Sequence, residues 1–237
     1  MIDTKNKNIL AVVPARGGSK GIFKKNLKKI GDNSLVAIAG LFLNEIPWIT
    51  KSIISSDDNE IIAEAKKHGL EAPFIRPKDL SNDSANSLDM WKHALLESER
   101  VYNEIFDYTI LIEPTSPFRK INDIELTINK LLIENFESAI TVSLTPAHFT
   151  PHKTLVLNDD DILNFFLPNG KDFSIRQNIP KFYHRNGICY ACKREYLLNT
   201  SSIIDSNTAG VVISRDVVNI DTIEDLDYAN YLLKIKK

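Results

Sequence analysis

The residues best suited to chemistry in this chain follow an apolar segment near its N-terminus. Residues 9–13 are apolar at every position, which is typical of a parallel strand covered on both faces. Glycines at positions 17, 18 and 21 come next, among cationic and amide side chains: Arg16, Lys20, Lys24, Lys25 and Asn26. Glycine has no side chain that would shield the backbone N–H groups, so these groups can bind phosphate oxygens, and nearby cations add positive charge. We therefore predict that this loop holds the phosphates of a nucleotide triphosphate.

Two common phosphate-binding motifs do not fit this loop. A Walker loop requires Gly-Lys-Ser or Gly-Lys-Thr, whereas Lys20 follows Ser19 and precedes Gly21. A dinucleotide-binding fingerprint requires G-x-G-x-x-G, which the spacing of the three glycines does not match. A tight turn with a solvated basic face would explain the glycine pair alone. The added cations and amide favour a phosphate site.

Residues 14–21, with Lys25 and Asn26, resemble the signature of the acylneuraminate cytidylyltransferases, which make CMP-sialic acid and related CMP-nonulosonic acids. Four later segments agree with this family, in the same order: Arg76-Pro77 with Leu80 and Asp83, residues 113–119, Arg176-Gln177 with Pro180 and Asn186-Gly187, and Asp221-Thr222 with Glu224-Asp225-Leu226. Because these segments span nearly the whole chain, chance similarity does not account for them.

The resemblance implies an enzyme that transfers CMP from CTP to the anomeric hydroxyl of a nonulosonic acid of the sialic or legionaminic type. Pyrophosphate would be released with the help of Mg²⁺, and the product would serve surface polysaccharide biosynthesis. One alternative is CTP-dependent activation of another ulosonic acid, such as pseudaminic acid or Kdo. A second alternative is a nucleotide-binding relative without turnover.

The resemblance also implies a role for individual side chains. Those expected to act on the triphosphate are Arg16, Lys20, Lys25 and Asp221. Those expected to bind the rest of CTP are Ala15, Gly17, Ser19, Asn26, Arg76, Ala85 and Ser87. Those expected to bind the sugar acid are Glu113, Ser116, Lys153, Arg176, Asn186 and Tyr190. The expected magnesium ligands are Asp221 and Asn219.

Two positions depart from the family pattern. Asn219 stands where the family has a second acid, and its amide oxygen can coordinate Mg²⁺ without adding negative charge. Glu113 stands where many members have glutamine. A carboxylate close to an anionic sugar acid costs binding free energy unless it is protonated or turned aside, so Glu113 indicates a different substrate.

Composition excludes several classes of protein. The formal net charge of −2 lacks the basic excess of a nucleic-acid-binding protein, and no apolar stretch reaches membrane-spanning length. The first residues do not have the pattern of a signal peptide, so we expect a cytoplasmic protein. The two cysteines, Cys189 and Cys192, lie in a strand-like run that points them to opposite faces, which argues against a metal or redox pair.

Alternating patterns along the chain predict an α/β fold. After the first strand we expect helices over 34–46, 60–67, 86–100 and 122–134, and strands over 48–55, 72–75, 108–112 and 138–143. This order predicts a single domain, residues 1–237, with a doubly wound, mostly parallel sheet of the Rossmann-like nucleotidyltransferase type. Ligands of such sheets bind beyond the carboxyl ends of the strands, where the predicted site residues converge.

Residues 145–180 interrupt the alternation and predict an excursion from the sheet. Residues 158–161 are typical of a hairpin turn, and an aromatic and aliphatic run over 162–167 follows it. The resemblance implies that this inserted segment forms the interface of a homodimer and reaches into the partner's active site. Considered without the family, the apolar run at 165–167 could pack onto its own domain.

Overall fold

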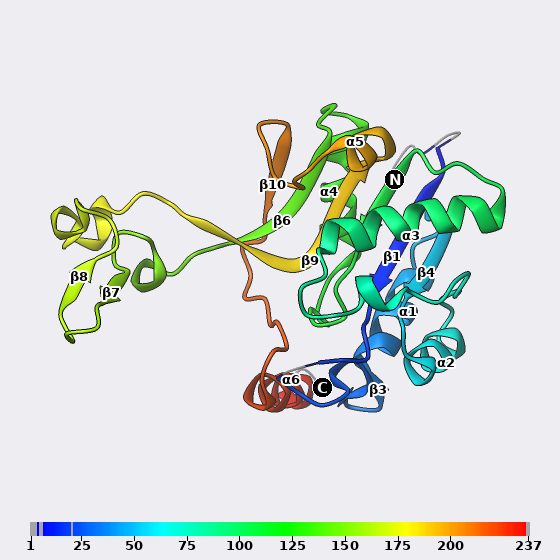
Figure 1. The fold of residues 1–237 in the computed structure, drawn as a ribbon, viewed down its shortest axis with the longest axis horizontal. Helices are drawn as coiled ribbons and strands as arrows, with labels where there is room; N and C mark the ends of the chain where they lie inside the picture. Colours follow the sequence, from blue (N-terminus) through cyan, green and yellow to red (C-terminus); the bar gives the residue numbers. More distant parts are fainter. Residues whose placement is uncertain (1–3, 5–6, 20, 236–237) are drawn as a thin grey trace.

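One mixed β-sheet forms the centre of the molecule, and the computed structural model describes residues 4, 7–19 and 21–235. Its six strands are β1 (Ile9–Pro14), β4 (Lys51–Ser55), β5 (Tyr108–Leu111), β6 (Ser138–Leu144), β9 (Tyr183–Lys193) and β10 (Thr208–Val212). They lie in the order β10-β6-β9-β5-β1-β4 (Figure 1). β9 runs antiparallel to both neighbours, and the remaining strands are parallel to one another. The predicted mostly parallel sheet is confirmed.

Helices cover both faces of this sheet, as a doubly wound fold requires. They are α1 (Leu35–Asn44), α2 (Asn59–Lys67), α3 (Ser87–Tyr102), α4 (Ile121–Leu132), α5 (Arg194–Asn199) and α6 (Ile223–Ile235). Side chains of β1 alternate between two hydrophobic cores, which explains why the strand is apolar at every position. The odd-numbered residues 9–13 pack with α1, α2 and α4, and the even-numbered ones pack with α3.

Polar side chains begin three helices close to where the sequence predicts them. Ser34 Oγ accepts a hydrogen bond from the Ala37 N–H at 3.1 Å at the start of α1. Asp58 caps α2 and Asn86 caps α3 in the same way. These caps satisfy N–H groups that have no partner inside the helix, so the chain turns into each helix directly after a strand or loop.

The strand predicted over 72–75 is wrong. Glu71 makes an isolated parallel bridge to Ile53, and residues 72–75 form no strand. Pro73 has no N–H group to continue the ladder, so pairing ends beside it. The second strand begins at Lys51 rather than at residue 48, while Trp48 is partly buried against the hydrophobic core.

The segment that follows β1 packs against the last helix of the described chain. A short hairpin of β2 (Lys29–Ile30) and β3 (Asn33–Ser34) packs against α6, with the Gly31 N–H donating to Asn230 Oδ1 at 3.0 Å. Ile22, Ile220 and Ala229 belong to one small hydrophobic core. This core fixes the residues that precede α6 next to the loop that follows β1.

The segment over 145–180, called the arm below, leaves the sheet and projects away from the rest of the molecule (Figure 1). It contains a hairpin of β7 (Leu155–Leu157) and β8 (Leu163–Phe165) and three 3₁₀ turns, Ala147–Phe149, Gly170–Phe173 and Arg176–Asn178. The predicted turn at 158–161 is confirmed, with Asp161 at φ 61°. The apolar side chains of the arm are mostly exposed to solvent, among them Leu157, Leu163, Phe165 and Phe166. In this chain the run at 165–167 therefore does not pack onto the main body.

The predicted orientation of the two cysteines is confirmed. Cys189 and Cys192 are both buried and belong to the cores on opposite faces of the sheet. Burial raises the pKa of both thiols, which makes them unreactive. Within residues 4, 7–19 and 21–235, no helix has the length and apolar character needed to cross a bilayer.

Arg194 should stabilise the fold through a buried carboxylate. Its guanidinium binds both oxygens of Glu99, at 2.7 and 2.9 Å, and the Glu99 side chain is 7% exposed. Arg194→Met leaves that carboxylate without its cation, so we expect the free energy of unfolding to fall by about 3 kcal/mol. Urea denaturation measures this change.

A matched control is Arg100→Met, because Arg100 pairs with Glu97 on the exposed surface of α3. We expect it to cost less than about 1 kcal/mol. Equal losses of unfolding free energy in the two variants would show that the buried Arg194–Glu99 pair stabilises the fold no more than an exposed ion pair does.

Candidate functional site

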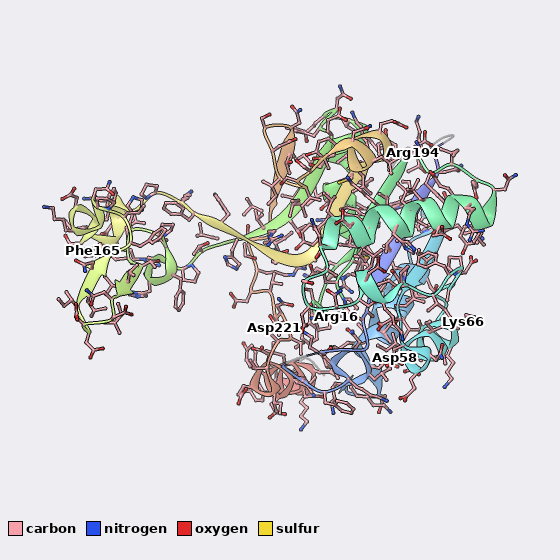
Figure 2. The ribbon with its side chains drawn as sticks, in the orientation of Figure 1. Arg16, Asp58, Lys66, Phe165, Arg194 and Asp221 are labelled. Atoms are coloured by element: carbon pink, nitrogen blue, oxygen red, sulfur yellow. The ribbon has the colours of Figure 1, made fainter. Side chains whose placement is uncertain are left out.

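A cleft of about 710 Å³ opens beyond the carboxyl ends of β1 and β5. Four parts of the described chain, far apart in the sequence, line it: residues within 14–19 and 21–26, within 76–90, within 111–115 and within 219–221. Figure 2 labels Arg16 and Asp221, which come from the first and the last of these stretches and lie on the same side of the sheet. The predicted convergence of site segments at this edge is observed.

The glycine-rich loop is fastened to the residues that follow β4. The Gly17 N–H donates to Asp57 Oδ1 at 2.9 Å, and the Ala15 N–H donates to the Ser55 carbonyl at 3.0 Å. A Cβ atom on Gly17 would lie 2.9 Å from Asp58 Oδ2, so only glycine fits there without displacement. The Ser19 N–H donates to the Gly17 carbonyl at 3.2 Å. Two of the loop amides expected to face phosphates are therefore engaged inside the protein.

Two cations of this region project toward the cleft and are paired with carboxylates. Arg16 binds Asp83 at 3.0 Å and the Asn82 carbonyl at 2.8 Å. Lys25 Nζ lies 2.9 Å from Asp221 Oδ1. Asn26 donates its amide to the Arg16 carbonyl at 3.2 Å, which holds the loop closed. Lys20, the third predicted cation, lies outside the described residues.

The backbone of Asp221 lies very close to the glycine-rich loop. A Cβ atom on Gly21 would lie 2.6 Å from the Asp221 carbonyl oxygen. Asp225 accepts hydrogen bonds from the Asp221 and Thr222 N–H groups, and these bonds lower the pKa of its carboxyl. The Asp225 N–H donates to Thr222 Oγ1 at 3.2 Å, so Thr222 and Asp225 form a capping box at the start of α6. The cap fixes the backbone that carries Asp221.

The oxygen donors here fit a divalent cation that also binds phosphates. The Asp221 carboxylate is 65% exposed toward the cleft, and the Asn219 amide lies beside it, donating to Asp221 Oδ2 at 3.3 Å. Mg²⁺ commonly takes one or two protein carboxylates and completes its shell with phosphates and water. The described part of the chain has no group of three or more His, Cys, Asp or Glu placed to hold a metal. The donor set thus suits a cation shared with a triphosphate.

The cleft also contains a buried guanidinium. Arg76 donates Nε to Ser55 Oγ at 3.0 Å and Nη2 to the Ser55 carbonyl. Burial lowers the pKa of Arg76 to about 10, and the charge of Asp57 opposes this shift. Ala85 and Ser87 line the cleft beside Arg76. These residues offer a fixed cation and polar backbone groups to a flat heterocycle.

The residues predicted to bind the sugar acid divide into three groups. Glu113 lines the cleft, whereas Ser116, Asn186 and Tyr190 lie behind it. Ser116 Oγ donates to the Asn186 carbonyl at 2.8 Å. The Asn186 side chain bonds to Thr141 and Ser143 within the sheet, so its amide is already satisfied. Lys153 and Arg176 lie on the arm, away from the cleft of their own chain.

Two residues to which the sequence analysis assigned no site role hold the cleft together. Asp57 anchors Gly17, and it could have been found because it follows the carboxyl end of a predicted strand. Arg119 donates Nη2 to the Glu113 carbonyl, while its buried Nε and Nη1 have no hydrogen-bond partner among the described residues. Burial lowers the pKa of Arg119 to about 10. Nothing in the sequence alone indicates that this arginine is buried.

Solved structures share this architecture. The structure of CMP:2-keto-3-deoxy-manno-octonic acid synthetase complexed with CTP superposes with a TM-score of 0.72, over 98% of this chain and all of that one, at 16% identity. The 4-diphosphocytidyl-2C-methyl-D-erythritol synthase of Anaerococcus prevotii gives a TM-score of 0.65 at 17% identity, with 97% of each chain covered. At this level of identity the likeness shows the fold.

Sequence comparison defines the family. The flagellin modification protein B of Campylobacter coli is 31% identical over 96% of both chains. The CMP-N,N'-diacetyllegionaminic acid synthase of Campylobacter jejuni is 32% identical over the same shares, and a pseudaminic acid cytidylyltransferase of that species is 32% identical over 95% of this chain and 96% of its own. A family model described as cytidylyltransferase matches residues 10–235. Since that match covers nearly the whole chain, this protein belongs to the cytidylyltransferase family.

Proposed function

We propose that this chain transfers CMP from CTP to the anomeric hydroxyl of a nonulosonic acid of the sialic or legionaminic type and releases pyrophosphate. The observation that carries the proposal is the meeting of Arg16, Lys25 and Asp221 in one cleft that also contains Arg76. The two cations and the carboxylate suit a triphosphate, and the buried guanidinium suits a nucleotide base. The names of the relatives support a nonulosonic acid as the acceptor.

The cations would act on the leaving group. Negative charge grows on pyrophosphate as its bond to the α-phosphorus breaks, and fixed cations stabilise that charge. Arg16, Lys25 and Lys20 would provide this positive charge. Each charged hydrogen bond to the phosphates would contribute about 1.5 to 3 kcal/mol. Asp83 and Asp221 pair with the first two of these cations, so CTP would exchange with carboxylates rather than with water alone.

Asp221, with the Asn219 oxygen, would hold Mg²⁺ once CTP supplies phosphate oxygens. When bound, Mg²⁺ supplies positive charge that neutralises the phosphates and polarises the α-phosphoryl group. Asp221 would then leave Lys25, and the ammonium group would become available to the phosphates. Asn219 adds no charge to the site, so the triphosphate would contribute most of the binding.

The arm would complete the acceptor site of a second subunit. Lys153 and Arg176 are the predicted partners of the sugar acid, and the arm projects away from its own cleft. The exposed apolar side chains of the arm support an interface, because such a patch on a soluble protein indicates a partner. We therefore propose a homodimer, with the arm as its dimerisation segment, that works in the cytoplasm and supplies surface polysaccharide biosynthesis.

Two alternatives remain for the acceptor and for turnover. The similarity to a pseudaminic acid cytidylyltransferase favours another nonulosonic acid, and the fold is shared with an enzyme for an octonic acid. Asn219 and the Glu113 carboxylate are the features that favour a nucleotide-binding relative without catalysis.

An assay of pyrophosphate release with CTP, Mg²⁺ and a panel of ulosonic acids tests the function. We expect turnover with nonulosonic acids, and a kcat/KM for Kdo lower by at least about 100-fold, because the loss of acceptor contacts weakens transition-state binding. CTP binding without turnover of any acceptor would support the non-catalytic alternative instead.

Asp221→Ala should remove the proposed magnesium ligand. We expect kcat to fall by about 100-fold or more, with a higher Mg²⁺ concentration needed for half-maximal rate. Asp227→Asn, an exposed change on α6, serves as the matched control and should keep wild-type kinetics. Full activity of Asp221→Ala with an unchanged magnesium dependence would contradict the assignment.

The double variant Leu163→Ser/Phe166→Ser should weaken the proposed dimer. Both side chains are exposed on the arm, Leu163 to 60% and Phe166 to 59%. Light scattering after size-exclusion chromatography should give a mass near twice 26.8 kDa for the wild type and near 26.8 kDa for the variant, with kcat/KM for the acceptor reduced. Ile133→Ser, which changes an exposed side chain at the end of α4, is the control. A monomeric wild type with full activity would rule the interface out.

A further inference from the structure

The strands β1 and β4 end together at the edge of the sheet that carries the cleft. They are parallel, and Pro14 at the end of β1 pairs with Ser55 at the end of β4. The chain then continues through Ser56 and Asp57, and residues 55–57 are called the β4 junction below. Ser55 and Ser56 are fully buried. The junction therefore begins level with the glycine-rich loop that follows β1.

The β4 junction fixes the backbone on both sides of Arg16. The Ala15 N–H donates to the Ser55 carbonyl at 3.0 Å, and the Gly17 N–H donates to Asp57 Oδ1 at 2.9 Å. Arg16 stands between these two anchored residues and lines the cleft. Two hydrogen bonds to one short segment thus determine where the Arg16 side chain leaves the backbone.

The same junction holds Arg76. Its Nε donates to Ser55 Oγ at 3.0 Å, its Nη2 donates to the Ser55 carbonyl, and its backbone N–H donates to the Ser56 carbonyl at 2.8 Å. Arg76 is buried, so these acceptors replace the water that the guanidinium loses. The Ser55 carbonyl oxygen accepts hydrogen bonds from both Ala15 and Arg76. A single atom therefore joins two walls of the cleft.

The junction itself lies behind the cleft. Neither Ser55 nor Asp57 is among the described residues that line it, whereas Arg16 and Arg76 both are. Beyond the effect of burial, the charge of Asp57 raises the pKa of Arg76 and the charge of Arg16 lowers it, so the three charged groups lie near one another. Any effect of the junction on a ligand must pass through the two arginines.

We propose that Ser55 and Asp57 are positioning residues that hold the two cleft arginines at a fixed spacing, an inference that rests on the proposed function. Arg16 is the proposed partner of the triphosphate, and Arg76 is the proposed partner of the base. CTP spans both, so its two ends meet guanidinium groups that one segment holds. This spacing places the α-phosphorus for attack, and a displacement of about 1 Å can lower a rate by about 100-fold.

Calorimetric titration with CTP, CMP and inorganic triphosphate, each with Mg²⁺, tests the role of Ser55. Ser55→Ala removes the acceptor of Arg76 Nε and keeps the carbonyl bond to Ala15. The affinities for CTP and CMP should fall about tenfold, because the base loses a fixed partner, while the affinity for inorganic triphosphate should stay within about twofold of wild type. Equal losses for all three ligands, or an unchanged affinity for CTP, would overturn this role. Ser201→Ala, an exposed change, is the matched control.

Asp57→Ala and Asp57→Asn test the second bond. Asp57→Ala leaves the Gly17 N–H without its acceptor, so kcat at saturating CTP and acceptor should fall by about 30-fold or more. Asp57→Asn removes the charge but keeps an oxygen that can accept this bond, so its kcat should return to within about threefold of wild type. A kcat of Asp57→Asn as low as that of Asp57→Ala, or a wild-type kcat of Asp57→Ala, would contradict the proposal.

Urea denaturation verifies that each variant is folded under the assay conditions. The positioning role and the proposed function fail in different ways. A wild type that binds CTP and turns over no acceptor would remove the proposed function, and the three titrations with Ser55→Ala would still test the positioning role, because they measure binding alone.

Discussion

The ion pair between Lys25 and Asp221 is the contact on which the site depends. It joins the loop after the first strand to the residues before the last helix, at 2.9 Å and across 196 positions of sequence. The small core around Ile220 and the capping box of α6 hold the aspartate in place. Without this packing, the glycine-rich loop would face solvent instead of a carboxylate.

The second constraint is the antiparallel strand β9 in the middle of an otherwise parallel sheet. It connects the arm to the core, since β6 and β9 are the two strands that enter and leave the arm (Figure 1). Its irregular pairing with β6, between Ile140 and Val142, lies near Gly187, whose positive φ makes room for the Glu113 carboxyl. One strand therefore positions both the arm and a wall of the cleft.

Buried charge is concentrated around this cleft. Arg76 and Arg119 are nearly fully buried, at 5% and 6% exposure, and Arg119 keeps two nitrogens without hydrogen bonds among the described residues. Burying a guanidinium costs free energy that hydrophobic packing elsewhere must offset. Such a cost is typical of functional sites, where a fixed charge is needed before the ligand arrives. The carbonyls of Ser55 and Glu113 are the groups these arginines hold.

The sequence by itself predicted the first strand, four of the helices that flank the sheet and the segments that line the cleft. The all-apolar run 9–13, the caps at Ser34 and Asp58, and the turn at 158–161 depend on neighbouring residues, so local pattern was sufficient. Only the tertiary structure decided that β9 runs antiparallel between β5 and β6. It also decided which carboxylate pairs with which cation and which loop amides are already bonded. These features depend on contacts between residues tens to hundreds of positions apart, whose geometry is set by the packing of the whole chain.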